Sequence, residues 1–161
     1  MIILRPLRDA DVPGIRAWPA YPPEFADLDY CLRPGGWLDE YRKKSGSIIL
    51  AALDDGEIAG FSILSDDGPG VREFRIALHP ARIGTGAGRT ILRRTLEYGF
   101  ADMRVKAVQL IVRRNNLRAQ RLYLQEHFAA TGECVRDVQG KPVEFFTMAI
   151  DRRTFFLGNR S

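Results

Sequence analysis

Three glycines in five residues, between an apolar strand and an amphipathic helix, constrain this chain more than any other feature. The strand pattern is VREFRIAL (71–78), and glycines follow at 84, 86 and 88. The helix pattern covers 87–103, with apolar residues at three- and four-residue spacing and arginines between them. Such a junction presents backbone N–H groups and the positive end of a helix dipole without covering side chains. It predicts either a site for a phosphate-bearing ligand or a tight turn that needs positive φ.

Two known phosphate-binding motifs do not fit this loop. A Walker A loop needs a Gly-Lys-Ser/Thr step five residues after its first glycine, and Arg89 stands there instead. The dinucleotide-binding pattern needs Gly or Ala at that place, and an acidic residue further along to hold a ribose. No acidic residue stands near position 108. The loop therefore argues against nucleotide hydrolysis and against hydride transfer.

The remaining sequence alternates between strand and helix patterns. Strands are predicted at 2–7, 47–53, 58–64, 71–78, 107–112, 129–138 and 143–150. Helices are predicted from Asp9 or Asp11 to Trp18, over 37–45 and 87–103, and from Asn115 or Asn116 to Glu126. Residues 19–36 carry four prolines and a Gly-Gly pair, which favour an irregular excursion with one helical turn at most. A hairpin block precedes a strand–helix–strand–helix block, which predicts one α/β domain over 1–161, a mixed sheet with helices on both faces.

Charge is divided unevenly along the chain. Residues 1–70 hold 7 basic and 12 acidic side chains, and residues 71–161 hold 17 and 8, for a net charge of +4. The arginine-rich second half indicates a polyphosphate cofactor, a nucleic acid, or a basic surface without a partner. No helix-turn-helix or RNA-recognition pattern accompanies it, so we expect no nucleic-acid partner. The acidic half either faces a cationic substrate or has no functional meaning.

The sequence gives no indication of a metal site, a disulfide or a membrane segment. Cys31 and Cys134 lie far apart and belong to no CxxC or CxxH cluster. No apolar run approaches the roughly 18 residues that span a bilayer, and the amino terminus becomes charged after four residues. We therefore expect a cytoplasmic protein, without a membrane partner and without a metal.

Two motifs together resemble the signatures of the GNAT superfamily of acetyl-CoA-dependent N-acetyltransferases. LHP (78–80) followed by IGTGAG (83–88) resembles the family's apolar-x-Pro step and its (Arg/Gln)-x-x-Gly-x-(Gly/Ala) loop. NLRAQRLY (116–123) resembles its Asn-x-x-Ala-x-x-x-Tyr motif. The chain departs from the family at Ile83, where Arg or Gln is usual, and at His127, where Gly is usual.

The resemblance implies acetyl-CoA as co-substrate and a mostly antiparallel sheet with a central, splayed parallel pair of strands. Backbone groups at the end of the 71–78 strand would hold the pantetheine arm, and one N–H there the oxyanion that forms during attack. Loop N–H groups would hold the pyrophosphate, and Arg82, Arg89 and either Arg118 or Arg121 suit the remaining charge. The cofactor residues that follow from the resemblance are Ile76, Ala77, Leu78, Ile83, Gly84, Thr85, Gly86, Ala87, Gly88, Arg89, Asn116 and Tyr123.

The family's acid role falls on Tyr123, which would protonate the departing thiolate. Asn116 and Tyr123 are seven residues apart and so lie within roughly 20° on one helix face. A core aromatic and a plain helix cap are the alternative interpretations of these two residues. The resemblance favours Glu73 as the base, but its register is off by about one residue, and a one-residue shift reverses strand faces. His79, Glu144 and a water chain remain alternatives.

The expected function is transfer of acetyl from acetyl-CoA to a primary amine by direct attack. The acceptor is either a small-molecule amine or a protein amine, with a pocket shaped by 19–46 and 65–70. The acidic balance of 1–70 favours a cationic acceptor such as a polyamine, an aminoglycoside, a lysine or a protein amino terminus. A homodimer remains open. The alternative function is a non-catalytic acyl-CoA-binding or regulatory domain on the same fold.

Overall fold

The computed structural model describes residues 1–158, and the chain forms two compact units. The first unit comprises Met1–Asp66 and Phe74–Tyr98, and the second comprises Asp67–Glu73 and Gly99–Ser161. The chain therefore passes between the units three times. Because this division differs from the single domain expected over 1–161, the single-domain assignment stays a prediction.

Seven strands, five α-helices and three 3-10 helices make up the regular structure of the described residues. The strands are β1 (Ile2–Pro6), β2 (Ser47–Asp54), β3 (Glu57–Asp66), β4 (Val71–Leu78), β5 (Ala107–Arg113), β6 (Ala129–Val138) and β7 (Lys141–Asp151). The helices are α1 (Val12–Arg16), α2 (Trp37–Lys43), α3 (Ala87–Phe100), α4 (Leu117–Gln125) and α5 (Arg152–Gly158). The strands are hydrogen-bonded in the order β1-β2-β3-β4-β5-β7-β6. The predicted mixed sheet, mostly antiparallel with one parallel pair at its centre, is confirmed.

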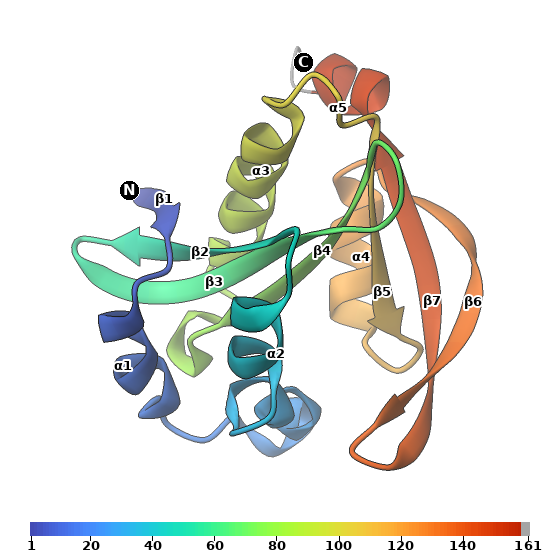
Figure 1. Cartoon of the computed structure of the whole chain (residues 1–161). Coiled ribbons are helices and arrows are strands. Elements are labelled where there is room, and N and C mark those ends of the chain that lie inside the picture. Colours follow the sequence, from blue (N-terminus) through green and yellow to red (C-terminus); the bar gives the residue numbers. More distant parts are fainter. Residues whose placement is uncertain (159–161) are drawn as a thin grey trace. The chain divides into compact units, whose positions relative to one another are not determined.

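The first unit places helices on both faces of its strands (Figure 1). On one face, Ala87 and Ile91 of α3 pack with Ile2 and Ala52, and with the partly buried Ile76 and Leu78 of β4. The other face carries α1, α2 and residues 23–32, and it buries Ala77. The period-2 pattern of β4 is thus confirmed, because successive side chains point to opposite faces.

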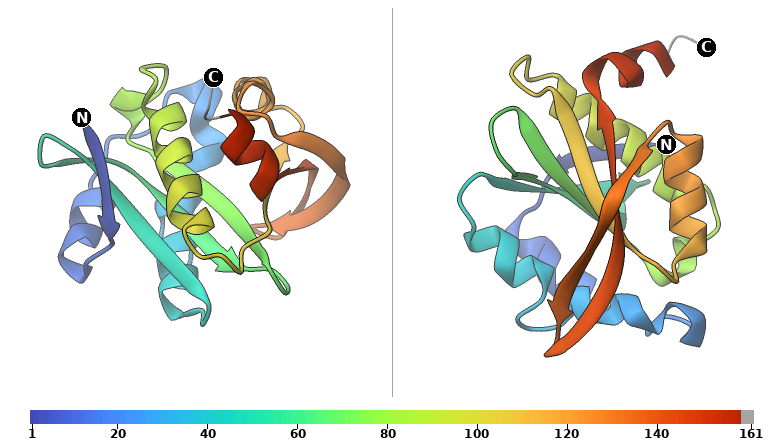
Figure 2. Two further views of the ribbon diagram at one scale, coloured as in Figure 1. Left: turned by 90° about the horizontal axis from the view of Figure 1, so that it is seen from above. Right: turned by 90° about the vertical axis from the view of Figure 1, so that its right-hand side faces the viewer.

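The second unit contains the parallel ladder and a long antiparallel hairpin. Val71, Arg72 and Glu73 of β4 pair with Ala107, Val108 and Gln109 of β5. Strand β7 pairs with β5 on one side and with β6 on the other, and Figure 2 shows how strongly the β6–β7 hairpin twists. Helix α5 follows β7 directly, and the carboxylate of Asp151 accepts the N–H of Thr154 at 2.7 Å. The sequence analysis missed α5, although an Asp before an apolar run is a start signal for a helix.

Three predicted segments differ from the structure. Residues 19–36 contain a 3-10 helix at Pro23–Leu32, longer than the single turn expected, which begins with a proline and buries Cys31 and Leu32. Helix α3 ends at Phe100 rather than at 103, because Asp102 accepts the N–H of Arg104 in a turn. The predicted first helix is a 3-10 turn followed by the short α1. There Asp11 does not cap α1; it accepts two hydrogen bonds from Arg5 instead.

We predict that Gly60→Ala lowers the free energy of unfolding by about 1–3 kcal/mol, the usual effect of overpacking. A Cβ at Gly60 of β3 would lie 2.8 Å from the carbonyl oxygen of Ala77 and 3.0 Å from the side chain of Ile91. These two atoms belong to β4 and α3, which cannot both move aside without disturbing the first unit. Denaturant unfolding with tryptophan fluorescence measures the change.

Gly14→Ala is the matched control. A Cβ at Gly14, in the exposed face of α1, would meet no atom within 4 Å. Because alanine is the better helix former, this variant should be unchanged or slightly more stable. Equal stability of Gly60→Ala and the wild type would show that β3 can shift, and would contradict the packing argument.

Candidate functional site

The end of β4 is fixed by hydrogen bonds from distant parts of the first unit. The hydroxyl of Tyr21 donates to the carbonyl oxygen of Leu78 at 2.6 Å, and the N–H of His79 donates to the carbonyl of Ala59 at 2.8 Å. Burial raises the pKa of Tyr21, so its hydroxyl keeps the proton that it donates. The sequence analysis missed Tyr21, and no local pattern could have found it, because the contact spans 57 residues.

His79 has a structural task in the turn that follows β4. Its Nδ1 accepts the N–H of Ala81 at 3.0 Å and caps the 3-10 turn Pro80–Arg82. Its ring lies 5.2 Å from that of Trp18. Burial lowers the pKa of His79, which favours the neutral ring that this acceptor role requires. The geometry thus supports the loop interpretation of His79, because Nδ1 is already engaged.

Residues 83–88, the glycine loop, join this turn to α3. Gly84 and Gly86 have φ values of +83° and +88°, which a side chain would strain. Gly88 lies within α3, so no turn requires it to be glycine. Ile83 packs its side chain against the buried cluster of the first unit. Position 83 is where the GNAT signature has Arg or Gln. Because the side chain of Ile83 is packed and apolar, this chain offers only backbone groups there.

The start of α3 has the electrostatic character of an anion site. Gly84 and Gly86 are exposed, and the first N–H groups of a helix have no acceptor within it. The N–H of Ala87 is directed to Oγ1 of Thr85 at 3.4 Å. The dipole of the 14-residue α3 places partial positive charge at the same end. Arg82, in contrast, donates to the carboxylate of Asp54, so its charge is neutralised within the chain.

Helix α4, in the second unit, is preceded by Asn116 and carries Tyr123 near its C-terminal end. Oδ1 of Asn116 accepts the N–H of Ala119 at 3.1 Å, so Asn116 caps the helix, one of the two residues that the sequence offered for this task. Gln120 holds the preceding turn, because its Nε2 donates to the carbonyls of Arg113 and Arg114 at 3.0 Å each.

The C-terminal end of α4 holds Tyr123 in place through its backbone. Phe128 N–H donates to the carbonyl of Tyr123 at 2.9 Å, and His127 N–H donates to that of Leu124 at 3.1 Å. With His127 at φ +73°, this is a Schellman motif, whose left-handed position usually holds glycine. The rings of Tyr123 and Phe128 pack 5.6 Å apart. Tyr123 is 6% exposed, and burial raises its pKa, so its hydroxyl stays protonated at neutral pH.

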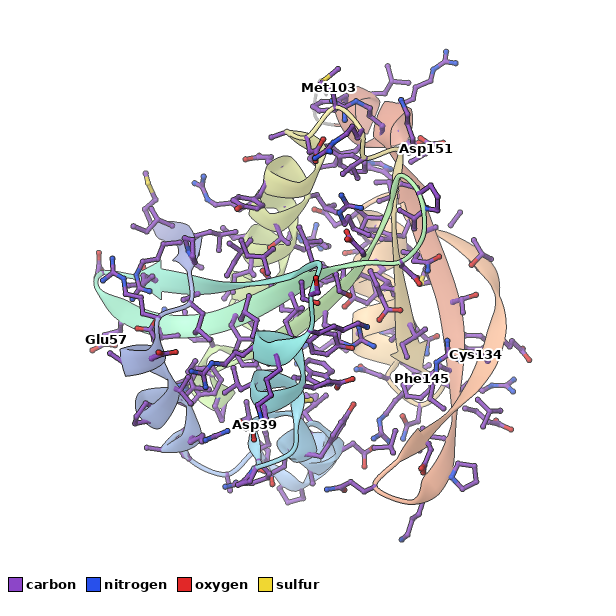
Figure 3. The ribbon with its side chains drawn as sticks, viewed as in Figure 1. Asp39, Glu57, Met103, Cys134, Phe145 and Asp151 are labelled. Atoms are coloured by element: carbon purple, nitrogen blue, oxygen red, sulfur yellow. The ribbon has the colours of Figure 1, made fainter. Side chains whose placement is uncertain are left out.

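The other candidate residues also have defined places. Glu73 is half-buried on β4, opposite Gln109 of β5. Glu144 is exposed and lies 3.3 Å from Arg114, as expected of a solvated strand residue. Cys134 is paired in register with Phe145, and Figure 3 labels both on the neighbouring strands β6 and β7. Cys31 is buried, and neither cysteine forms a disulfide.

The predicted site residues thus form two sets. The end of β4 and the glycine loop lie together in the first unit, whereas Glu73, Asn116 and Tyr123 lie in the second. Within residues 1–158, no helix is both long enough and apolar enough to cross a bilayer. The same residues contain no cluster of three or more His, Cys, Asp or Glu side chains suited to a metal ion.

Comparisons with known proteins found one matching family model and several similar solved structures. The sequence model of the acetyltransferase (GNAT) family matches residues 13–128. A spermidine N-acetyltransferase from Vibrio cholerae, solved with CoA and spermine, is 20% identical, with 96% of this chain and 98% of that chain covered and a TM-score of 0.77. An aminoglycoside acetyltransferase solved with coenzyme A is 21% identical over 100% of both chains, with a TM-score of 0.74. An acetyltransferase of the GNAT family from Streptococcus pneumoniae is 20% identical, covering 94% and 99%, with a TM-score of 0.66. No curated protein matches the sequence.

We predict that Asn116→Ala destabilises the protein by about 0.5–2 kcal/mol, the usual effect of removing an N-cap. The variant removes the oxygen that accepts the N–H of Ala119. Asn116→Asp keeps an acceptor at the same place and should remain close to wild type. Thermal unfolding of both variants measures the difference, and two equally stable variants would exclude the cap as a stabilising contact.

Proposed function

Because this chain belongs to the GNAT acetyltransferase family, we propose that it transfers the acetyl group of acetyl-CoA to a primary amine, by direct attack in a ternary complex. The observation that carries the proposal is the glycine loop. Two glycines with positive φ lead into α3, and their exposed backbone precedes the N–H groups of its first turn. A pyrophosphate suits this arrangement, because the positive end of the α3 dipole and the N–H groups of its first turn are both directed at the same place.

Donor binding is proposed to rest on backbone groups more than on side chains. Residues 76–78 would bind the pantetheine arm, and the loop from Ile83 to Gly88 would bind the pyrophosphate. Arg89 follows the loop and would supply positive charge. Arg82 is left out of this set, because its guanidinium group donates to Asp54.

Acetyl-CoA supplies a thioester, an activated acyl group with a sulfur leaving group. The amine must be neutral when it attacks, so Glu73 or a water chain would take its proton. An N–H of residues 76–78 would donate to the carbonyl oxygen as that oxygen gains charge. As the new C–N bond forms and the C–S bond breaks, the nitrogen would lose its remaining extra proton to solvent. The hydroxyl of Tyr123 would donate its proton to sulfur and regain one from solvent. The raised pKa of Tyr123 keeps this group in its acid form.

A small-molecule amine is the acceptor that we propose. The Vibrio cholerae protein is a spermidine N-acetyltransferase, and another similar structure is an aminoglycoside acetyltransferase; the acceptors in both names are polyamines or amino sugars. The acidic excess of residues 1–70 is a second, weaker argument for a cationic acceptor. Carboxylates at 11, 29, 39 and 54 each pair with an arginine, but three of these arginines belong to residues 1–70 and are already counted in the excess, so only Arg82 reduces it.

Acetyl-CoA is expected to stabilise the protein, whereas NAD and ATP are not. At about 100 times its Kd a ligand adds roughly 2.7 kcal/mol, which is a rise in Tm on the order of 5–10 °C for a chain of this size. Gly86→Asp should abolish the rise, because it places a carboxylate where the pyrophosphate is proposed. A thermal-shift titration measures both.

Gly86→Ala is the matched control for this variant. A Cβ at Gly86 would meet no atom within 4 Å, although φ is +88°, so alanine adds backbone strain without charge. We expect Gly86→Ala to keep part of the acetyl-CoA response. Normal binding by Gly86→Asp would contradict the phosphate assignment.

Tyr123→Phe separates the acid role from a packing role. It keeps the ring beside Phe128 and removes only the hydroxyl. If Tyr123 protonates the thiolate, kcat should fall by roughly 10²-fold with little change in the affinity for acetyl-CoA. If Tyr123 is only packed, kcat stays the same, and stability changes by about 0.5–1.5 kcal/mol at most.

The measurement is steady-state turnover with a panel of polyamines and aminoglycosides as acceptors. Equal kcat for Tyr123→Phe and the wild type, with chemistry rate-limiting, would remove Tyr123 from the mechanism. Binding of acetyl-CoA without turnover of any amine would favour the non-catalytic acyl-CoA-binding domain instead.

A further inference from the structure

We propose that Asp54 is a positioning residue for donor binding, because it holds the glycine loop through Arg82 in the conformation that presents backbone N–H groups to the donor's phosphates. The inference rests on the proposed function, since it assumes a donor that carries phosphates. It concerns a residue outside every motif of the sequence, on the β2–β3 hairpin rather than on β4 or α3.

The first step is the contact between Asp54 and Arg82. Arg82 Nη1 donates to Oδ2 of Asp54, and the amino group of Met1 donates to Oδ1, the other carboxylate oxygen, at 3.2 Å. The side chains of Arg82 and Asp54 are 29% and 23% exposed, so solvent screens this pair less than an ordinary surface ion pair. The hydrogen bond from Arg82, more than any other contact, holds the pKa of Asp54 below its usual range.

The second step is that Arg82 also carries the loop through its backbone. Its N–H donates to the carbonyl of His79 at 2.8 Å. Its carbonyl accepts the N–H of Thr85 at 3.3 Å and the hydroxyl of Thr85 at 2.6 Å. Oγ1 of Thr85 in turn accepts the N–H of Ala87, the first residue of α3. A chain of hydrogen bonds therefore runs from Asp54 to the N-terminus of α3.

The third step is that the loop needs such an anchor. Gly84 and Gly86 adopt positive φ, but glycine also populates many other conformations at little cost. A loop that is disordered before binding must be ordered by the ligand, which lowers affinity. The Asp54–Arg82 contact fixes the residue just before the loop, so that the N–H groups are oriented before the donor arrives.

The direction in which Asp54→Asn changes the affinity for acetyl-CoA distinguishes a positioning role from a purely electrostatic one. Replacing Asp54 by Asn removes a negative charge near the proposed anion site, so electrostatics alone predicts tighter binding of acetyl-CoA. Loss of positioning predicts weaker binding in the same variant. The two effects have opposite directions, and one measurement therefore separates them.

The experiment compares KM for acetyl-CoA with KM for S-acetylpantetheine, a donor without phosphates, in the wild type and in Asp54→Asn. We expect KM for acetyl-CoA to rise about fivefold or more, the range that loss of loop order produces. KM for S-acetylpantetheine should stay the same, because this donor does not reach the loop. A general loss of stability would instead change both donors alike.

Glu57→Gln is the matched control, because it removes the same charge from the same hairpin. Glu57, labelled at the hairpin tip in Figure 3, lies 4.0 Å from Arg82 and is 84% exposed. It is too distant and too solvated to hold the arginine. We expect its KM for acetyl-CoA to be unchanged or slightly lower.

Three results would overturn the inference: an unchanged or lower KM for acetyl-CoA in Asp54→Asn, an equal rise in KM for both donors, or an equal rise in Glu57→Gln. Calorimetry of CoA binding to the wild type and to Asp54→Asn distinguishes a failure of this inference from a failure of the proposed function. If the wild type does not bind CoA, the proposed function itself fails. If the wild type and Asp54→Asn bind CoA equally, only the positioning role of Asp54 is wrong.

Discussion

The conversion of strand β4 into helix α3 is the constraint on which the first unit depends. The strand must stop, turn and start a helix that packs back onto it, with Ala87 and Ile91 against Ile76 and Leu78. Only residues 79–86 are available for this reversal. A short 3-10 turn, capped by His79, and two glycines with positive φ achieve it. The loop that results is rigidly connected at both ends, which is what a preorganised binding site for an anion requires.

In the second unit, the chain must likewise change direction sharply where α4 ends. A Schellman motif stops the helix, and its hydrogen bonds return to the carbonyls of Tyr123 and Leu124. His127 occupies the left-handed position, where glycine would be less strained. Its ring closely approaches Gly158 of α5, because a Cβ at Gly158 would lie 2.7 Å from it. The departure from the family pattern at His127 therefore leaves the helix end intact and adds a contact with α5.

Ion pairs within the chain change how the uneven distribution of charge along the sequence is interpreted. The acidic first part and the basic second part suggest two complementary surfaces, one for a cation and one for an anion. In the first unit, however, Asp54 neutralises Arg82 directly beside the glycine loop. In the donor site that we propose, backbone N–H groups and the helix dipole would recognise the phosphates, and both depend on geometry more than on charge. The precise orientation of the loop would then matter more in this chain than the number of its arginines.

The sequence by itself determined the seven strands, most of the helices and the family, because these depend on local patterns. Alternation predicts β4, three- and four-residue spacing predicts α3, and two motifs at the right separation identify the family that the sequence model then matched. The C-terminal end of α3 and the length of the 3-10 helix at Pro23–Leu32 were not predicted correctly, because side-chain contacts beyond the local pattern decide where such elements end. Only the tertiary structure revealed Tyr21 on the carbonyl of Leu78 and Asp54 on Arg82. These contacts join residues 57 and 28 positions apart, and no periodicity or motif records which distant side chains folding brings together.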